Sequence, residues 1–299
     1  IRMNPSPDPL FTRVNREYMQ QNWPTHYRRM QGAAEAFGED LLSDKFDFKE
    51  LWQFSVPGCS NIYYPNTTTA NGHAVLSRNY DLPAGVEPVS TKEPYLMEAY
   101  PDEGYPCLYM SAYDLLGCAT DGINSEGLVV ALLADIETGL PFSDPEYPIN
   151  CCYNYGGSMA SGPGIGLMAI QIPRFILETC KDAEEAKHAL LTVMHHYEAQ
   201  PLQYIVSDRH GNGFVFEGLM QGNLPRFHDC GGAPLPVTNH CLKHCETDLP
   251  PTRHLMTWIL SVQTPTVSRP YYQSVRGNIS GTPHREPFGT DIMIWKNAH

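Results

Sequence analysis

A cysteine that is followed along the chain by an arginine and an aspartate is the part of this sequence best suited to chemistry. Cys59 comes directly after Gly58, and Arg78 and Asp81 lie on the next stretch of strand-forming sequence. A guanidinium close to a thiol stabilises the thiolate, which is the nucleophilic form of cysteine. A carboxylate can hold an α-amine, whose pKa of about 7.7–8.0 suits a general base at neutral pH. We therefore predict that the chain cuts itself between Gly58 and Cys59, so that Cys59 becomes a new N-terminus and the catalytic residue.

The residues between Cys59 and Asp81 predict a β-hairpin that brings these groups together. The stretch 61–64 is rich in strand formers, and 66–72 contains an Asn-Gly pair that tolerates the positive φ of a turn. Antiparallel neighbours would then place Arg78 beside Cys59. A papain-like Cys-His protease would instead have a helix beginning at its cysteine, and the sequence after Cys59 favours a strand.

Composition limits the class of protein. The chain has 299 residues, of which 42% are hydrophobic and 18% charged, as is typical of a globular protein with a full core. A net charge of −13 argues against nucleic acids and anionic membranes as partners. No window approaches the roughly eighteen apolar residues that a membrane-spanning helix needs. The chain begins with Ile1 and not with Met, which favours a mature or trimmed form.

The nine cysteines leave two cellular contexts open. If Cys59 is a nucleophile, eight remain (9 − 1), an even number that permits disulfides in a secreted protein. A chain of this size does not need disulfides for stability, so reduced thiols and a cytoplasmic location are the expectation. A signal peptide that has been removed would favour secretion instead.

The chain divides at Cys59 into two predicted parts. Residues 1–58 are predicted to be a propeptide or a small α subunit, helical and amphipathic from about 11 to 55. Residues 59–299 would form the catalytic domain, the β subunit. Its predicted elements are a hairpin over 115–133 with a turn over 120–127, loops over 83–105 and 141–165, helices over 172–181, 182–195 and 252–262, and strands over 203–207 and 213–217. Strands that come in hairpins, with few and clustered helices, predict an α+β fold in which helices cover both outer faces of two antiparallel sheets.

Five segments, in this order, resemble the cysteine N-terminal-nucleophile hydrolases of the choloylglycine hydrolase, penicillin (isopenicillin N) acyltransferase and acid ceramidase group. The segments are Gly58-Cys59, the strand ending in Arg78-Asn79-Tyr80-Asp81, the Gly122–Leu128 turn, the 204–217 hairpin and Val237-Thr238-Asn239-His240. The resemblance spans roughly residues 59–253. It implies a four-layer αββα sandwich of two antiparallel sheets.

The resemblance also implies a role for each matched residue. Cys59 would be the nucleophile, and Arg78 and Asp81 would match the paired active-site arginine and aspartate of the family. Asn239 would help to form the oxyanion hole. Arg253 resembles the last active-site arginine of the ceramidase branch, although this match is looser.

Three further residues are expected to line the oxyanion hole or the substrate, namely Asn124, Ala134 and Asp135. Bile-salt hydrolases have an asparagine near the nucleophile where this chain has Ala134. A backbone N–H could still donate to the oxyanion, but the side-chain contact is lost. This departure weakens the case for a bile-salt substrate.

The reaction that the resemblance implies has two stages. Cys59 first attacks the carbonyl of Gly58, in an N-to-S shift followed by hydrolysis. The freed Cys59 then attacks a substrate amide and forms a thioester, from which water or another amine takes the acyl group. The expected substrate is a small N-acyl amide or peptide-like compound, no cofactor is expected, and the expected assembly is a homo-oligomer or a processed α/β heterodimer. An acyltransferase and a catalytically silent ligand-binding relative remain as alternatives.

A metal site is an alternative interpretation of residues 240–245. His240-Cys241 and His244-Cys245 offer pairs at i, i+4 spacing, which can bind zinc on a helix. However, no second pair follows at zinc-finger spacing, and His240 already belongs to the motif of Asn239. We therefore expect no metal.

Overall fold

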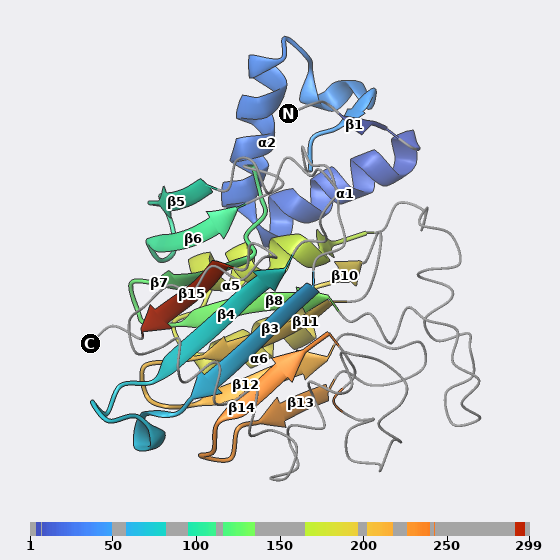
Figure 1. The fold of residues 1–299 in the computed structure, drawn as a ribbon. Helices are drawn as coiled ribbons and strands as arrows, with labels where there is room; N and C mark the ends of the chain where they lie inside the picture. The colour runs from blue at the N-terminus through green and yellow to red at the C-terminus, as the bar shows by residue number, and fades with distance from the viewer. Residues whose placement is uncertain are drawn as a thin grey trace, which may run out of the picture.

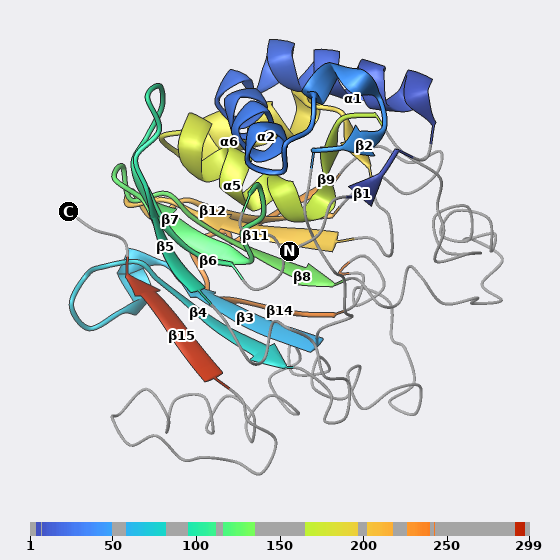
Figure 2. The same cartoon turned by 90° about the horizontal axis from the view of Figure 1, so that it is seen from above.

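Two antiparallel sheets stacked face to face form the frame of the fold, and helices lie over one of them (Figures 1 and 2). This computed structural model describes residues 4–6, 8–49, 58–81, 95–111, 116–134, 165–196, 202–217, 226–239, 242 and 291–296. The predicted α+β sandwich of two antiparallel sheets is confirmed, whereas the second helix layer of the predicted four-layer αββα arrangement stays a prediction, because the described helices lie over one sheet. The predicted helix over 252–262 lies outside the described residues.

The larger sheet has seven strands in the order β13-β12-β11-β8-β7-β6-β5, and each neighbouring pair is antiparallel. Its strands are β5 (Tyr95–Ala99), β6 (Cys107–Ser111), β7 (Asp121–Asn124), β8 (Val129–Ala134), β11 (Leu202–Ser207), β12 (Gly213–Glu217) and β13 (Arg226–Asp229). The central strands β8, β11 and β12 are apolar and covered on both faces, which explains their long runs of buried residues.

The smaller sheet has four strands in the order β14-β3-β4-β15 and is antiparallel throughout. Its strands are β3 (Gly58–Tyr64), β4 (Val75–Asp81), β14 (Leu235–Thr238) and β15 (Asp291–Lys296). The predicted hairpin that begins at Cys59 is therefore confirmed as β3–β4. Gly72 in its turn has a φ of 71°, the left-handed conformation expected of an Asn-Gly turn.

Helices cover the outer face of the seven-stranded sheet, as Figure 2 shows from above. The helices are α1 (Pro9–Asn22), α2 (Pro24–Ala36), α5 (Ile172–Thr179) and α6 (Ala183–Thr192). Helix α6 begins after Asp182, whose carboxylate accepts a hydrogen bond from the amide of Glu185. None of the described helices is long and apolar enough to cross a bilayer.

Side chains alternate along the strands of the large sheet and create two separate cores. Along β8, Val130 and Leu132 face the helices, whereas Val129, Ala131 and Leu133 face the small sheet. We call the first region the helix-side core and the second the inter-sheet core. Cys59 belongs to the inter-sheet core.

The predicted secondary structure was wrong in three places. The helical segment predicted over 11–55 ends at Ala36, and the chain continues through short pieces that include β2 (Phe46–Asp47), paired with β1 (Asn4–Pro5). The predicted turn over 120–127 contains strand β7, and the predicted loop over 83–105 contains strand β5. Exposed residues hid β5, which lies at the edge of the sheet, and polar residues hid β7, which is short and buried.

Candidate active site

Cys59 lies at the start of β3, on the face of the small sheet that packs against the large one. It is buried, with 2% of its surface exposed, and it pairs with Tyr80 on β4. Its backbone N–H donates a hydrogen bond of 2.5 Å to the side-chain oxygen of Asn239. The contact follows from strand pairing, because Thr238 lies opposite Ser60 and Asn239 comes directly after the end of β14.

Arg78 connects the thiol to the large sheet. Its Nη2 donates to the sulfur of Cys59 at 3.4 Å and to the carbonyl of Leu132 at 3.2 Å. Its Nη1 donates to the carboxylate of Asp121 at 2.7 Å. The arginine and aspartate side chains are 2% and 0% exposed, so the pair is shielded from water. A buried charge needs such a partner, because removing one member leaves the other uncompensated.

The thiol of Cys59 differs from the other buried thiols in its neighbours. Burial raises the pKa of Cys107 to about 12 and that of Cys180 to about 11, as expected for inert structural cysteines. Cys59 has a guanidinium N–H within hydrogen-bond reach of its sulfur. A cation in that position favours the thiolate, so the arrangement suits nucleophilic attack.

Two other candidates, Asp81 and Ala134, are the last residues of β4 and β8, but their side chains are outside the described part of the structure. The backbone of Asp81 pairs with Gly58, directly beside the predicted cleavage point. Ala134 ends β8 and pairs with Leu202. Asp135 and Arg253 lie outside the described residues, as does most of the 240–245 segment proposed for zinc.

Asn124 is not brought to Cys59. Its Nδ2 donates to the carbonyls of Leu177 and Cys180 at the end of α5, at 3.0 and 2.7 Å. Its Oδ1 accepts from the amides of Glu126 and Leu128 in the β7–β8 turn. The amide therefore joins this turn to α5 on the helix side of the large sheet, whereas Cys59 lies in the inter-sheet core. The expectation that Asn124 lines the substrate site is not met.

Sequence reasoning missed two residues of the site. Asp121, which holds Arg78, was assigned to a turn, and its pairing across the two sheets has no signal in sequence spacing. Asn61 lies opposite Arg78 in the β3–β4 register and is 1% exposed. Its side-chain amide has no hydrogen-bond partner in the part of the chain that is described. A buried amide without a partner costs about 1–3 kcal/mol of stability. Because this costly side chain lies next to Arg78, Asn61 is a further candidate for the site.

No group of three or more His, Cys, Asp or Glu side chains that could hold a metal ion occurs among the described residues. The described cysteines, Cys59, Cys107, Cys118, Cys180 and Cys230, are present as thiols and not in disulfides. The described site brings together a thiol, a guanidinium, a carboxylate and a side-chain amide.

The site thus has a buried cysteine at the start of an inner strand, between two stacked antiparallel sheets. Comparison with protein families shows that residues 67–254 match the family described as acyl-coenzyme A:6-aminopenicillanic acid acyl-transferase. The match covers more than half of the chain, and the chain belongs to this family. The matched range contains Arg78, Asp121 and Asn239 and begins eight residues after Cys59 (67 − 59).

Three solved structures that match the chain are those of an acylase, a hydrolase and an amidase. Penicillin V acylase from Agrobacterium tumefaciens is 20% identical with a TM-score of 0.34, covering 57% of this chain and 49% of its own. A variant of the conjugated bile acid hydrolase from Clostridium perfringens is 15% identical with a TM-score of 0.41, covering 70% and 58%. The Caenorhabditis elegans ortholog of N-acylethanolamine-hydrolyzing acid amidase is 16% identical with a TM-score of 0.43, covering 79% and 92%.

The chain thus spans about half the length of the penicillin V acylase and 58% of the bile acid hydrolase. No curated protein sequence matches it.

Proposed function

We propose that this protein is a self-processing amidase that cleaves the C–N bond of an N-acyl compound through a thioester on Cys59. One observation carries the proposal: Arg78 donates to the sulfur of Cys59 while Asn239 accepts from its backbone nitrogen. The thiol and the nitrogen of one residue thus each have a polar partner. A nucleophile whose own α-amine serves as base needs both groups to be held.

Self-cleavage is the proposed first stage. The Cys59 thiolate attacks the carbonyl carbon of Gly58, the C–N bond breaks, and the nitrogen takes up a proton. Water then hydrolyses the resulting thioester, which releases Gly58 as a carboxylate and Cys59 as a free N-terminus. Gly58 has no Cβ to obstruct the attack. Its backbone pairs with Asp81, whose carboxylate we propose holds the new amine.

Amide cleavage is the proposed second stage. The α-amine of Cys59 takes the thiol proton, and the sulfur attacks the acyl carbon of the substrate. The amine portion leaves with a proton. Water then attacks the thioester, the C–S bond breaks, and the acyl group is released as an acid while the Cys59 thiol is restored. Because the oxygen of Asn239 faces the Cys59 nitrogen, its Nδ2 is the end of the amide that would donate to the oxyanion.

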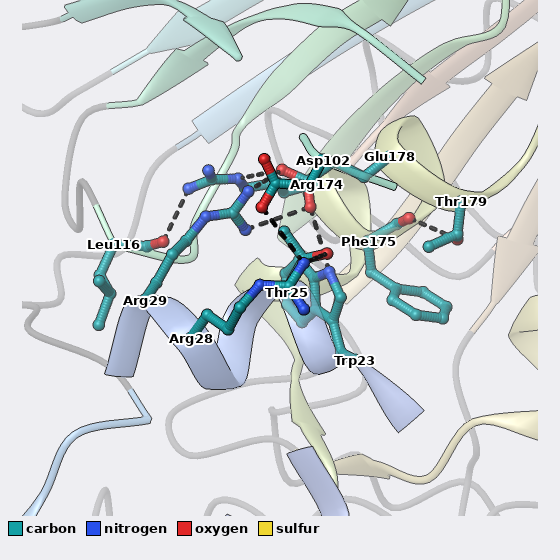
Figure 3. Close-up of polar contacts among 10 residues, drawn as sticks. All are labelled: Trp23, Thr25, Arg28, Arg29, Asp102, Leu116, Arg174, Phe175, Glu178 and Thr179. Atoms are coloured by element: carbon teal, nitrogen blue, oxygen red, sulfur yellow. Dashed lines mark hydrogen bonds and ion pairs between the residues drawn. The ribbon is translucent and has the colours of Figure 1, made fainter. Parts of the chain in front are cut away.

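We further propose that the segment before Cys59 remains bound after cleavage as a small subunit. Met19, Trp23, Met30 and Phe48 are buried in the helix-side core. Glu178 of α5 accepts hydrogen bonds from Trp23 and Arg29 of the segment as well as from Arg174 of its own helix (Figure 3). Losing the segment would expose this apolar surface and leave a buried carboxylate with fewer donors.

An acyltransferase is the second candidate, because the family to which the chain belongs is described by acyl transfer. Both reactions form the same thioester and differ only in what removes the acyl group. Adding a primary amine to the assay separates them. An acyltransferase would form the new amide faster than the free acid, whereas a hydrolase would keep releasing acid.

The function is tested with a panel of N-acyl aminocoumarins that differ in acyl chain. We expect turnover by the wild type and none by Cys59→Ala. Asn239→Ala should fold and lose about 10²–10³ in kcat, the usual cost of an oxyanion donor. Asn124→Ala is the matched control, because it removes an equally buried asparagine amide on the other side of the sheet. Near-normal turnover by Asn239→Ala would remove it from the site.

A further inference from the structure

We propose that Glu217 is a positioning residue that keeps Asn239 against the backbone nitrogen of Cys59. The inference rests on the proposed function, in which that nitrogen becomes the α-amine and Asn239 serves the same reaction. Neither the family resemblance nor the sequence spacing gave Glu217 a role. The structure suggests a role because the buried carboxylate of Glu217 connects the large sheet to the chain just beyond Asn239.

The carboxylate of Glu217 is held from several sides. The residue is 4% exposed at the end of β12. One oxygen accepts from Nε2 of His228 at 2.8 Å, and the other from Nε2 of Gln203 at 3.3 Å. The oxygen that faces Gln203 also accepts from the backbone amide of Leu242. Gln203 and His228 stand on β11 and β13, the strands on either side of β12, so the carboxylate is fixed within its own sheet.

The contact with Leu242 connects the two sheets. Glu217 follows Val215 by two residues, so its side chain projects from the same face, toward the inter-sheet core. Leu242 comes three residues after Asn239 (242 − 239), and its side chain packs in the same core as Cys59. Strand β14 fixes the chain on one side of Asn239, through the pairing of Thr238 with Ser60. Glu217 fixes it on the other side.

This arrangement explains why a charged residue stands at a buried position. Apolar side chains would fill the space without the desolvation cost of a carboxylate. A carboxylate gives a directional, charge-assisted bond to one backbone amide, which an apolar contact cannot supply. A displacement of about 1 Å at a catalytic group can cost roughly 10²-fold in rate. A fixed anchor close to Asn239 therefore serves catalysis more than overall stability.

A double-mutant cycle on kcat tests the inference, with an N-acyl aminocoumarin as the probe. Glu217→Leu removes the acceptor, and we expect kcat to fall by about 10²-fold with KM little changed. Glu217→Gln keeps an oxygen for the Leu242 amide and should recover most of that loss. In the Asn239→Ala background, Glu217→Leu should have no further effect, because it acts through Asn239. If the kcat losses of Glu217→Leu and Asn239→Ala multiply in the double variant, the inference is overturned.

The matched control is Glu178→Gln, which changes an equally buried carboxylate in the helix-side cluster. It should lower stability, and its effect on kcat should be small and independent of Asn239. If Glu217→Leu does not fold, His228→Ala enters the same cycle, because it removes another contact of the same carboxylate from a partly exposed strand. Its smaller loss should likewise vanish in the Asn239→Ala background, and a loss that persists there contradicts the inference.

A structural measurement separates this inference from the proposed function. In a crystal structure of Glu217→Leu, or of His228→Ala if only that variant folds, the oxygen of Asn239 should lie beyond hydrogen-bond distance of the Cys59 nitrogen, with β11 to β13 unchanged. An Asn239 that stays in place overturns the role of Glu217 even if the enzyme is active. A wild type without turnover would refute the proposed function, whereas the position of Asn239 in the variant would still decide the role of Glu217.

Discussion

The protein contains two buried ionic clusters that are built in opposite ways. Around Cys59 a cation is central, since Arg78 is shared by the carboxylate of Asp121, a carbonyl and a thiol. At the helix layer an anion is central, since Glu178 accepts from Trp23 and two arginines. A central carboxylate surrounded by donors joins segments together. A central guanidinium with one contact to a thiol can stabilise a charge that develops during a reaction.

The largest expected effect comes from replacing one arginine in each cluster, and it should distinguish the two clusters. Arg78→Met and Arg174→Met each leave a buried carboxylate without its full charge compensation, and each should cost roughly 3–5 kcal/mol in the free energy of unfolding. Only Arg78→Met should slow the alkylation of Cys59 by iodoacetamide, by about tenfold for each unit of pKa that the thiol gains. Urea titration and mass spectrometry of the labelled peptide measure the two quantities. Equal alkylation rates in both variants would mean that Arg78 is structural.

A smaller effect concerns the attachment of the N-terminal segment. Trp23→Phe keeps most of the ring but removes the N–H that donates to Glu178 at 3.1 Å. A hydrogen bond to a charged group is worth about 1.5–3 kcal/mol, so the variant should unfold more easily by that amount. Its rate of Cys59 alkylation should match the wild type.

After cleavage, the two fragments of the wild type should elute together in gel filtration and separate only in denaturant. Fragments that separate in native buffer would contradict the subunit proposal.

A further effect is a pH dependence of stability that arises in the helix layer. Burial above all, together with the charges of Arg29, Arg174 and Lys49, lowers the pKa of His26 to about 3, although a hydrogen bond to the Lys49 carbonyl opposes the shift. Because the folded pKa is below the ordinary 6.5, the unfolded chain binds the proton first. The stabilising contribution is therefore full above pH 6.5 and is lost as the pH falls from 6.5 toward 3, by about 1.4 kcal/mol per pH unit.

This dependence is checked by urea titration of the wild type and of His26→Gln between pH 7 and pH 5. The wild type should lose more stability over this range than the variant. Parallel losses would show that His26 does not govern the response of this layer to acid.

The sequence predicted the part of the site that depends on neighbouring residues in one hairpin. Strand-forming residues and the Asn-Gly turn were enough to place Arg78 beside Cys59, because local pairing fixes their register. Asp121 and Glu217 could not be predicted, because both reach the site across the gap between two sheets, which leaves no mark in sequence spacing. The prediction for Asn124 was wrong, because the family motif identified this residue but did not show on which face of the sheet its side chain lies.

The central claim is that Cys59 becomes an N-terminal nucleophile. Intact-mass measurement of the purified wild type and of Cys59→Ala tests it most directly. We predict two fragments for the wild type, with masses that place the break between Gly58 and Cys59, and a single uncut chain for Cys59→Ala. An uncut wild type that is nevertheless fully active would contradict the account.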